Sequence, residues 1–303
     1  MKLISMKMQW LLRGSIILLI GAIAACSTPS TTPEASNTNA TETTEVATKA
    51  DPQETVRKVV ALTSLTADLV QTLEEDVLVG MPGTSILQAD ERFAGLEVVS
   101  APRTEPDLEK IVALEPDLVI GAIGFHDRAL DRLQELDIET MAVDVNGWDS
   151  LKALTQDLAQ KIDADPEPLL NRYDACLAQA PETAPTALVL VSRQPLLSPN
   201  QQSWAGDFLT QFNIKNVTAD FQGESEFDGY ITLSEEKVLT VDADMLLVVE
   251  TEENVLAQLK GDAFWGELKA TQNDAVHVFD YFGFINPGSI MSIEATCEKL
   301  AQL

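Results

Sequence analysis

Short apolar runs of strand length, separated by amphipathic helical stretches, follow one another from Arg57 onward and restrict the folds open to this chain. The runs occupy residues 58–62, 77–80, 118–121, 140–143, 187–191, 245–249 and 276–279. Between two of them, Leu130, Leu133 and Leu136 recur at helical spacing. Continuous apolar strands that alternate with helices indicate parallel sheets covered on both faces. We therefore predict an α/β fold.

The alternation is interrupted once, between residues 143 and 187, by a segment typical of a long helix. Asp165 suits the N-cap and Pro166 the first helical position, and Pro181 and Pro185 mark the end. We therefore predict an N-terminal α/β lobe over 56–164, a linker helix over 165–182 and a C-terminal α/β lobe over 183–303. A single helix between two lobes would act as a stiff strut.

An internal repeat supports this division. A shift of 127 residues (109 to 236) places the segment 109–120 on the segment 236–247, and the hydrophobic pattern is kept throughout. Both segments begin with Glu-Lys, and each predicts a short helix, an acidic turn and a central strand. Any two helix-strand units share some of this pattern, but the shared Glu-Lys start raises the match above that background.

The N-terminus predicts export. Lys2, Lys7 and Arg13 precede a short apolar run that ends in Ala24-Ala25-Cys26, which is typical of a signal peptide over 1–25 and too short for a membrane span. The cysteine resembles that of a bacterial lipobox and would then be lipidated; ordinary secretion is the alternative. Residues 26–55 are rich in Ser, Thr and Pro and predict a disordered tether to a membrane facing the periplasm or the cell exterior.

Net charge and cysteine content exclude some classes of binding partner and site. The formal net charge is −28, which argues against binding to nucleic acid or to an anionic membrane surface. Cys176 and Cys297 remain after cleavage in a compartment where disulfides can form. Two cysteines are too few for a disulfide framework or a cysteine metal cluster, and whether they pair depends on a distance that the sequence leaves open.

Two motifs together resemble a known family. The segments 104–111 and 113–120 (TEPDLEKI and ALEPDLVI) resemble the N-lobe signature of the ferric-siderophore, haem and vitamin B12 binding proteins of ABC importers. The segment 229–236 (GYITLSEE) resembles the matching C-lobe motif, with further similarity at 206–209 and 286–288. The resemblance runs from about Val59 to Leu303, and it is more specific for the family than for the ligand.

The resemblance implies two Rossmann-like lobes joined by a single long helix, with the ligand in the inter-lobe cleft and only modest closure on binding. It also implies that Glu109 and Glu236 dock into arginine pockets of the permease subunits; solvated helix-face glutamates are the alternative. Two matching anions on two matching lobes suit a symmetric partner. We expect the protein itself to be a monomer.

Candidate ligand contacts are aromatic and arginine side chains in loops after strands, because such groups suit a large chelate with flat rings and oxygen ligands. They are Arg103, Phe125, Arg193, Trp204, Tyr230, Tyr281 and Phe282. Each has a structural alternative: Trp204 could anchor the core, Phe125 and Phe282 could cover a sheet edge, and Trp148 is expected to be a packing residue.

We expect neither a cofactor nor a metal held by the protein itself. The two histidines, His126 and His277, are too few for a zinc or manganese site, and His277 alternates with apolar residues in a strand. A ferric siderophore is the expected ligand, with vitamin B12 or haem as alternatives. Haem could be held through His126 or Tyr230.

An enzyme is not expected. The sequence contains no dinucleotide-binding Gly-x-Gly-x-x-Gly after a strand, no phosphate-binding loop and no Gly-x-Ser-x-Gly elbow. A lipoprotein that only senses its ligand and signals to a partner is a further alternative. The sequence thus predicts a lipid-anchored, ligand-delivering component of an ABC importer.

Overall fold

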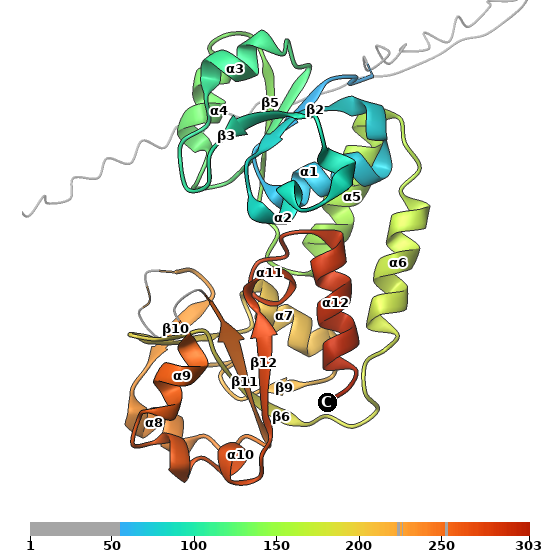
Figure 1. Cartoon of the computed structure of the whole chain (residues 1–303). Coiled ribbons are helices and arrows are strands. Elements are labelled where there is room, and N and C mark those ends of the chain that lie inside the picture. Colours follow the sequence, from blue (N-terminus) through green and yellow to red (C-terminus); the bar gives the residue numbers. More distant parts are fainter. Residues whose placement is uncertain (1–54, 223–224, 226, 252–253) are drawn as a thin grey trace, which may run out of the picture. The chain divides into compact units, whose positions relative to one another are not determined.

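The computed structural model describes residues 55–222, 225, 227–251 and 254–303. The predicted signal peptide, Cys26 and the tether lie outside the described residues. Contacts group residues 52–303 into one unit. Its sequence runs through two α/β halves with helix α6 (Glu167–Leu177) between them (Figure 1).

The first half is built on a five-stranded parallel sheet of order β3-β2-β1-β4-β5. Its strands are β1 (Val59–Ala61), β2 (Leu78–Pro82), β3 (Glu97–Ser100), β4 (Leu118–Ala122) and β5 (Glu139–Val143). Its helices are α1 (Ser64–Leu73), η1 (Glu75–Val77), α2 (Ser85–Gln88), η2 (Glu91–Phe93), α3 (Leu108–Ala113), α4 (Asp127–Gln134) and α5 (Trp148–Ile162).

The second half contains a parallel sheet of order β12-β11-β6-β9 and an antiparallel sheet of order β10-β8-β7. The strands are β6 (Thr186–Leu190), β7 (Ser192–Arg193), β8 (Leu196–Pro199), β9 (Lys215–Asn216), β10 (Tyr230–Leu233), β11 (Met245–Glu250) and β12 (Val276–Asp280). The helices are α7 (Trp204–Gln211), α8 (Glu235–Thr240), α9 (Val255–Lys260), η3 (Trp265–Glu267), α10 (Lys269–Gln272), α11 (Tyr281–Phe284) and α12 (Ile290–Leu300).

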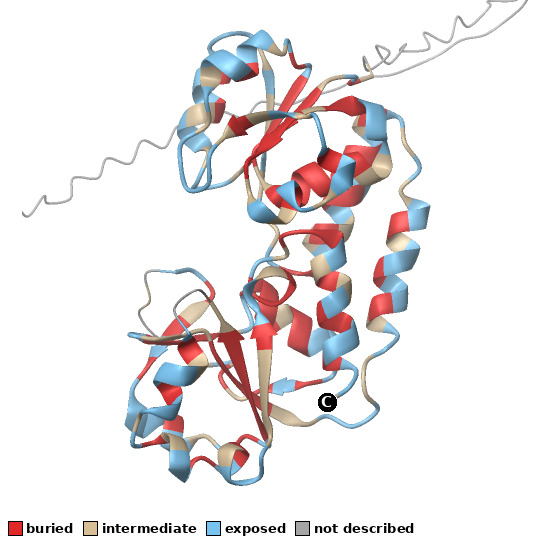
Figure 2. Cartoon of the chain, viewed as in Figure 1, coloured by how far each residue is buried: buried red, intermediate tan, exposed pale blue. Residues whose placement is uncertain are grey.

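The predicted α/β class and the strands at all seven apolar runs are confirmed. The second half also contains an antiparallel sheet of β7, β8 and β10, which the sequence did not predict. Strand β3 was not predicted, since only Val98 and Val99 of its four residues are apolar. Figure 2 shows buried residues concentrated in the central strands, whereas α6 and α8 carry many exposed residues.

The linker helix α6 begins close to the start expected from the sequence. Pro166 is its N-cap, and Asp165 caps from one residue earlier, since its Oδ1 accepts a hydrogen bond from the Glu167 amide at 3.0 Å. The helix ends at Leu177, before the predicted end of the linker at residue 182. Cys176 and Cys297 form a disulfide between α6 and α12, with a Cα–Cα distance of 5.6 Å. Arg172 and Glu294 add a two-point ion pair between the same helices.

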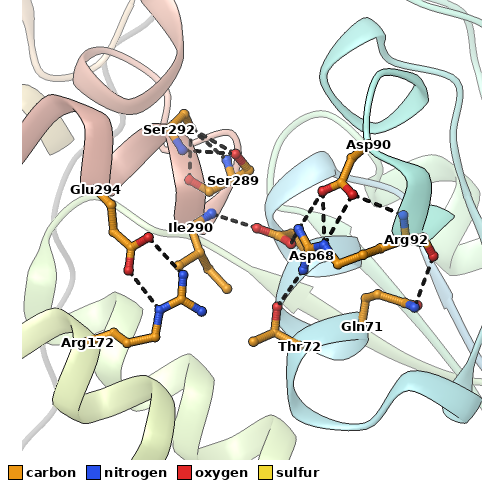
Figure 3. A network of polar contacts seen from close by, with 10 residues as sticks. All are labelled: Asp68, Gln71, Thr72, Asp90, Arg92, Arg172, Ser289, Ile290, Ser292 and Glu294. Carbon is orange, nitrogen blue, oxygen red and sulfur yellow. Dashed lines mark hydrogen bonds and ion pairs between the residues drawn. The ribbon is translucent and has the colours of Figure 1, made fainter.

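The last helix of each half is capped by the first long helix of the other half. The amide of Ile290, the first residue of α12, donates to Asp68 of α1 at 2.7 Å (Figure 3). The amide of Trp148, the first residue of α5, donates to Asp207 of α7, also at 2.7 Å. Each carboxylate satisfies an amide that has no partner within its own helix. These two crossed caps join the halves at equivalent places.

The Asp68 cap belongs to a larger polar network. Asp68 is 1% exposed and accepts a hydrogen bond from Arg92 at 2.8 Å, while Arg92 also binds Asp90 (Figure 3). The Arg92 guanidinium lowers the pKa of the Asp90 carboxyl through their hydrogen bond. The carboxylate of Asp68 is therefore buried but ion-paired and hydrogen-bonded, which is the condition under which a buried charge is tolerated.

Candidate ligand site at the carboxyl ends of the strands

All strands of the first sheet are parallel, so the loops that follow them meet at one edge. The same holds for β6, β9, β11 and β12 in the second half. Ligands of open parallel sheets bind beyond these carboxyl ends. The predicted contacts Arg103 and Phe125 follow strands of the first sheet, whereas Arg193, Tyr281 and Phe282 follow or end strands of the second half.

The loop after β4 presents apolar side chains to solvent. Phe125 is 88% exposed and Ile123 is 55% exposed. The backbone beneath them is held in place, because the Ile123 amide donates to the Val143 carbonyl at 3.0 Å and the Gly124 amide donates to Asp127 at 2.9 Å. Gly124 has a φ of 79°, which favours glycine. The loop therefore holds an exposed phenyl ring on a fixed backbone, and Phe125 does not cover the sheet edge.

His126 closes this loop and is half-buried. Its Nδ1 accepts a hydrogen bond from the Ala122 amide at 3.0 Å, and burial lowers the pKa of the imidazole. A neutral imidazole that accepts at Nδ1 carries its proton on Nε2. Nε2 then has no free lone pair for a metal, so the hydrogen bond gives His126 a structural role.

Arg103 lies in the exposed loop after β3 with a φ of 59°, an uncommon conformation for a residue other than glycine. Among the residues that the structure describes, Arg103 has no ion-pair partner. Its guanidinium is therefore available to a ligand. Of the two arginines predicted as ligand contacts, it is the one without a carboxylate partner.

Arg193, by contrast, is committed to Asp262. Its Nε donates to both carboxylate oxygens, at 3.0 and 2.9 Å, and its Nη2 donates to one of them at 2.5 Å. The Asp262 side chain is only 8% exposed. The pair raises the pKa of Arg193 and lowers the pKa of Asp262. Because most of its forked donor face is occupied, we assign Arg193 a structural role.

Three aromatic residues of the second half are predicted ligand contacts, and two of them pack against each other. Tyr281 and Phe282 directly follow β12, and their ring centroids are 5.4 Å apart at 77°. Tyr230 begins β10, and its pKa is raised, first by burial and second by the neighbouring Tyr281. Tyr281 is 38% exposed, so its ring retains a free face. A site shared by Tyr230, Tyr281 and Phe282 stays a prediction.

Trp204 lies in the core. It is 3% exposed, its Nε1 donates to the Gly283 carbonyl at 2.8 Å, and its ring lies 5.5 Å from those of Trp148 and Phe208. The structural alternative is therefore the correct one, and Trp204 supports the turn that carries Tyr281 and Phe282. Trp148 is 1% exposed, which confirms its prediction as a packing residue.

The sequence reasoning missed two exposed apolar residues, Ile123 and Phe227. Phe227 is 57% exposed, and its carbonyl accepts a hydrogen bond from the Tyr230 amide at 3.1 Å. Both residues could have been found from the sequence, because each is a large apolar residue in a loop next to an aromatic residue predicted to contact the ligand.

The internal repeat corresponds to a duplicated structural unit. Asp117 before β4 accepts hydrogen bonds from the Arg57 and Lys58 amides, both at 2.8 Å. Asp244 before β11 accepts from the amide and hydroxyl of Thr186, at 3.1 and 2.7 Å. In both halves an aspartate thus ties the central strand to the start of the first strand. The repeat predicted from the sequence is confirmed.

No group of three or more His, Cys, Asp or Glu side chains within the described part of the chain could hold a metal ion. In the same residues, no helix combines the length and the apolar character needed to cross a membrane.

Comparison with known proteins agrees with the fold. A family model described as periplasmic binding protein matches residues 59–281. The vitamin B12-binding protein of Salmonella typhimurium is 27% identical over 205 residues, which cover 65% of this chain and 74% of that protein.

Solved structures share the fold. An ABC transporter substrate-binding protein from Listeria monocytogenes matches with a TM-score of 0.67 and 22% identity, over 82% of this chain and 98% of that one. A periplasmic heme-binding protein of Vibrio cholerae matches with a TM-score of 0.65 and 18% identity, over 81% and 98%.

The fold and the match define an exported binding protein and not an enzyme. The chain belongs to the periplasmic binding protein family, the solute-binding proteins that serve ABC importers.

Proposed function

We propose that this chain captures a ferric siderophore and delivers it to an ABC importer, without a cofactor of its own. The observation that carries the proposal is the set of aromatic side chains at the carboxyl ends of both sheets, with Phe125 on one and Tyr281 and Phe282 on the other. Exposed rings can cover a large chelate by stacking and apolar contact.

The charge around these rings favours a chelate with little negative charge. Of the two predicted arginines, Arg193 is paired with Asp262, which leaves Arg103. The whole chain carries a formal net charge of −28, so it repels anionic ligands at long range. We therefore expect a ferric hydroxamate to bind in preference to a ferric catecholate.

Vitamin B12 is the second candidate, because curated relatives that are 26 and 27% identical are named vitamin B12-binding proteins. Haem is less well supported. An axial histidine ligand would need the His126 Nε2 lone pair, but the hydrogen bond from Ala122 to Nδ1 keeps the proton on Nε2. A tyrosinate ligand at Tyr230 is opposed by burial, which raises its pKa.

A lipid anchor at Cys26 is part of the proposal. It rests on the sequence Ala24-Ala25-Cys26 and on the polar tether that follows. Mass spectrometry of the exported protein tests it, because an unmodified Cys26 would exclude the anchor.

Delivery to an importer, as opposed to ligand sensing alone, is supported by the duplicated glutamates. Glu109 and Glu236 occupy the second position of α3 and α8, and both are exposed. Across the described residues, neither carboxylate has an ion-pair partner. Two unpaired anions at matching places suit two matching cationic pockets.

Fluorescence titration of the mature protein tests the ligand. Trp204 is a built-in reporter, because its Nε1 is bonded to the Gly283 carbonyl beside Tyr281 and Phe282. We expect saturable quenching by a ferric hydroxamate, weaker or no response to a ferric catecholate and haemin, and at least tenfold weaker binding for Phe125→Ala. The iron-free chelator and Leu136→Ala, at an equally apolar but distant exposed position, serve as controls.

Cyanocobalamin is titrated in parallel. Binding of cyanocobalamin alone would replace the siderophore by the second candidate. If none of the four chelates binds to the folded protein, the proposed ligand class is wrong.

A further inference from the structure

The helices that carry Glu109 and Glu236 match each other in the position of the cap, the glutamate and the buried anchor. Asp107 caps α3 by accepting from the Lys110 amide at 3.1 Å, and Ser234 caps α8 by accepting from the Lys237 amide at 3.1 Å. Each helix is anchored by one residue that is 0% exposed, Ile111 in α3 and Val238 in α8. The caps, the glutamates and the anchors all obey the same 127-residue shift.

The same shift relates two exposed apolar side chains. Val112 and Leu239 lie three residues after Glu109 and Glu236, on the same face of their helices, since residues three apart are neighbours on a helix surface. Both are 40% exposed. A single exposed apolar residue needs no explanation, but two at equivalent places, each beside an unpaired carboxylate, are not expected from packing alone.

We propose that Val112 and Leu239 are contacts to the importer and act together with Glu109 and Glu236. The proposal rests on the proposed delivery function. The occupant is a pair of identical or similar membrane subunits, each of which presents a cationic group beside an apolar surface. The glutamates supply steering and register, and the apolar side chains supply a contact that salt does not screen.

The duplication argues against the other occupants of such a face. A ligand held by aromatic loops has no need of two copies of one surface, and those loops follow β4 and β12 whereas Val112 and Leu239 lie in the helices that precede β4 and β11. A second copy of this chain would bring like charges together, because the net charge is −28 and each face carries a free carboxylate.

The experiment measures binding of the mature protein to the purified importer of the source organism in lipid nanodiscs, at about 50 and about 500 mM salt. The variants are Val112→Ser, Leu239→Ser, their combination, and the combination of Glu109→Ala with Glu236→Ala. From the apolar area each side chain exposes, we expect each serine variant to weaken binding by about threefold to eightfold and their combination by about tenfold to sixtyfold, at both salt concentrations. The glutamate variant is expected to lose affinity chiefly at low salt.

Matched controls are Leu136→Ser and Met291→Ser, whose side chains are 56 and 58% exposed but lie outside the two matching helices. Both should bind the importer like the wild type, and every variant should keep the wild-type affinity for the chelate. Wild-type binding by Val112→Ser and Leu239→Ser, or equal weakening by the controls, would overturn the inference while docking through the glutamates stands. If the wild type itself fails to bind the importer or to stimulate its ATPase, the delivery function fails as well.

Discussion

Replacing Asp68 by alanine is expected to lower the free energy of unfolding by about 3 kcal/mol, because a carboxylate that is 1% exposed and holds two partners is lost. The Ile290 amide at the start of α12 loses its acceptor, and Arg92 keeps its ion pair with Asp90 and its hydrogen bond to Thr72. Chemical denaturation followed by far-UV circular dichroism measures the change.

The conservative variant separates charge from hydrogen bonding. Asp68→Asn can still accept from the Ile290 amide but no longer neutralises Arg92, so we expect a loss of about 1–2 kcal/mol. Asp207→Ala removes the equivalent cap on the Trp148 amide. Because Asp207 is half-buried and pairs with no arginine in the described part of the chain, a loss of about 1–2 kcal/mol is expected.

Asp157→Ala is the control, since this exposed aspartate lies on the outer face of α5, where a substitution should change stability by no more than about 0.5 kcal/mol. If Asp68→Ala were as stable as Asp157→Ala, the crossed caps would not stabilise the contact between the last helix of each half and the other half.

Removing the disulfide is expected to lower the free energy of unfolding by an amount similar to that of Asp68→Ala. Cys176→Ala combined with Cys297→Ala should cost about 2–5 kcal/mol, because the bridge closes a loop between residues 121 positions apart and thereby restricts the unfolded chain. For a chain of this size, that corresponds to a fall in Tm of roughly 10 °C. Both cysteines are buried, at 3 and 0% exposed, so alanine also loses some packing.

A reducing agent separates the contribution of the covalent bridge from that of the packing of the two cysteine side chains. Dithiothreitol should lower the Tm of the wild type toward that of the double variant and leave the double variant unchanged. A wild type with two titratable thiols under oxidising conditions would contradict the bridge. The Arg172–Glu294 pair spans the same helices, so its removal alone should cost less, about 0–1 kcal/mol for an exposed pair.

The regular part of the fold follows from the sequence because strand-length apolar runs and helical spacing report burial directly. The repeat could also be recognised in the sequence, since each copy contains an aspartate, Asp117 or Asp244, that ties its central strand to its first strand. The antiparallel strands β7, β8 and β10 were not predicted. They are only two to four residues long, too short to show a period.

The sequence predicted which loops form the candidate site. It predicted less well which side chains of those loops are free to contact a ligand. Loops after parallel strands converge by topology, which placed Phe125, Tyr281 and Phe282 correctly at carboxyl ends. The fate of Arg193 depends on Asp262, 69 residues away, and that of Trp204 on Gly283, 79 residues away. A local pattern contains no information on such long-range partners.

The cap partners show the same limit. Asp68 and Asp207 each lie in a helix that reads as ordinary amphipathic sequence, and their partners lie 222 and 59 residues away. The sequence predicted modest closure from a single strut. The two crossed caps and the disulfide provide a stronger physical reason to expect it.

The central claim is that a metal chelate is held by the carboxyl-end loops of both halves, and amide hydrogen exchange of the mature protein tests it most directly. The protein is saturated with whichever of the four chelates binds in the titration. We predict slower exchange in residues 122–126 and in residues 281–286, where the His126 amide bonds to the Ala122 carbonyl and the Gly283 amide bonds to the Asn286 carbonyl. Helices α3 and α8 should be unaffected. Protection of only one of these loops, or of neither, in the saturated protein would contradict the claim.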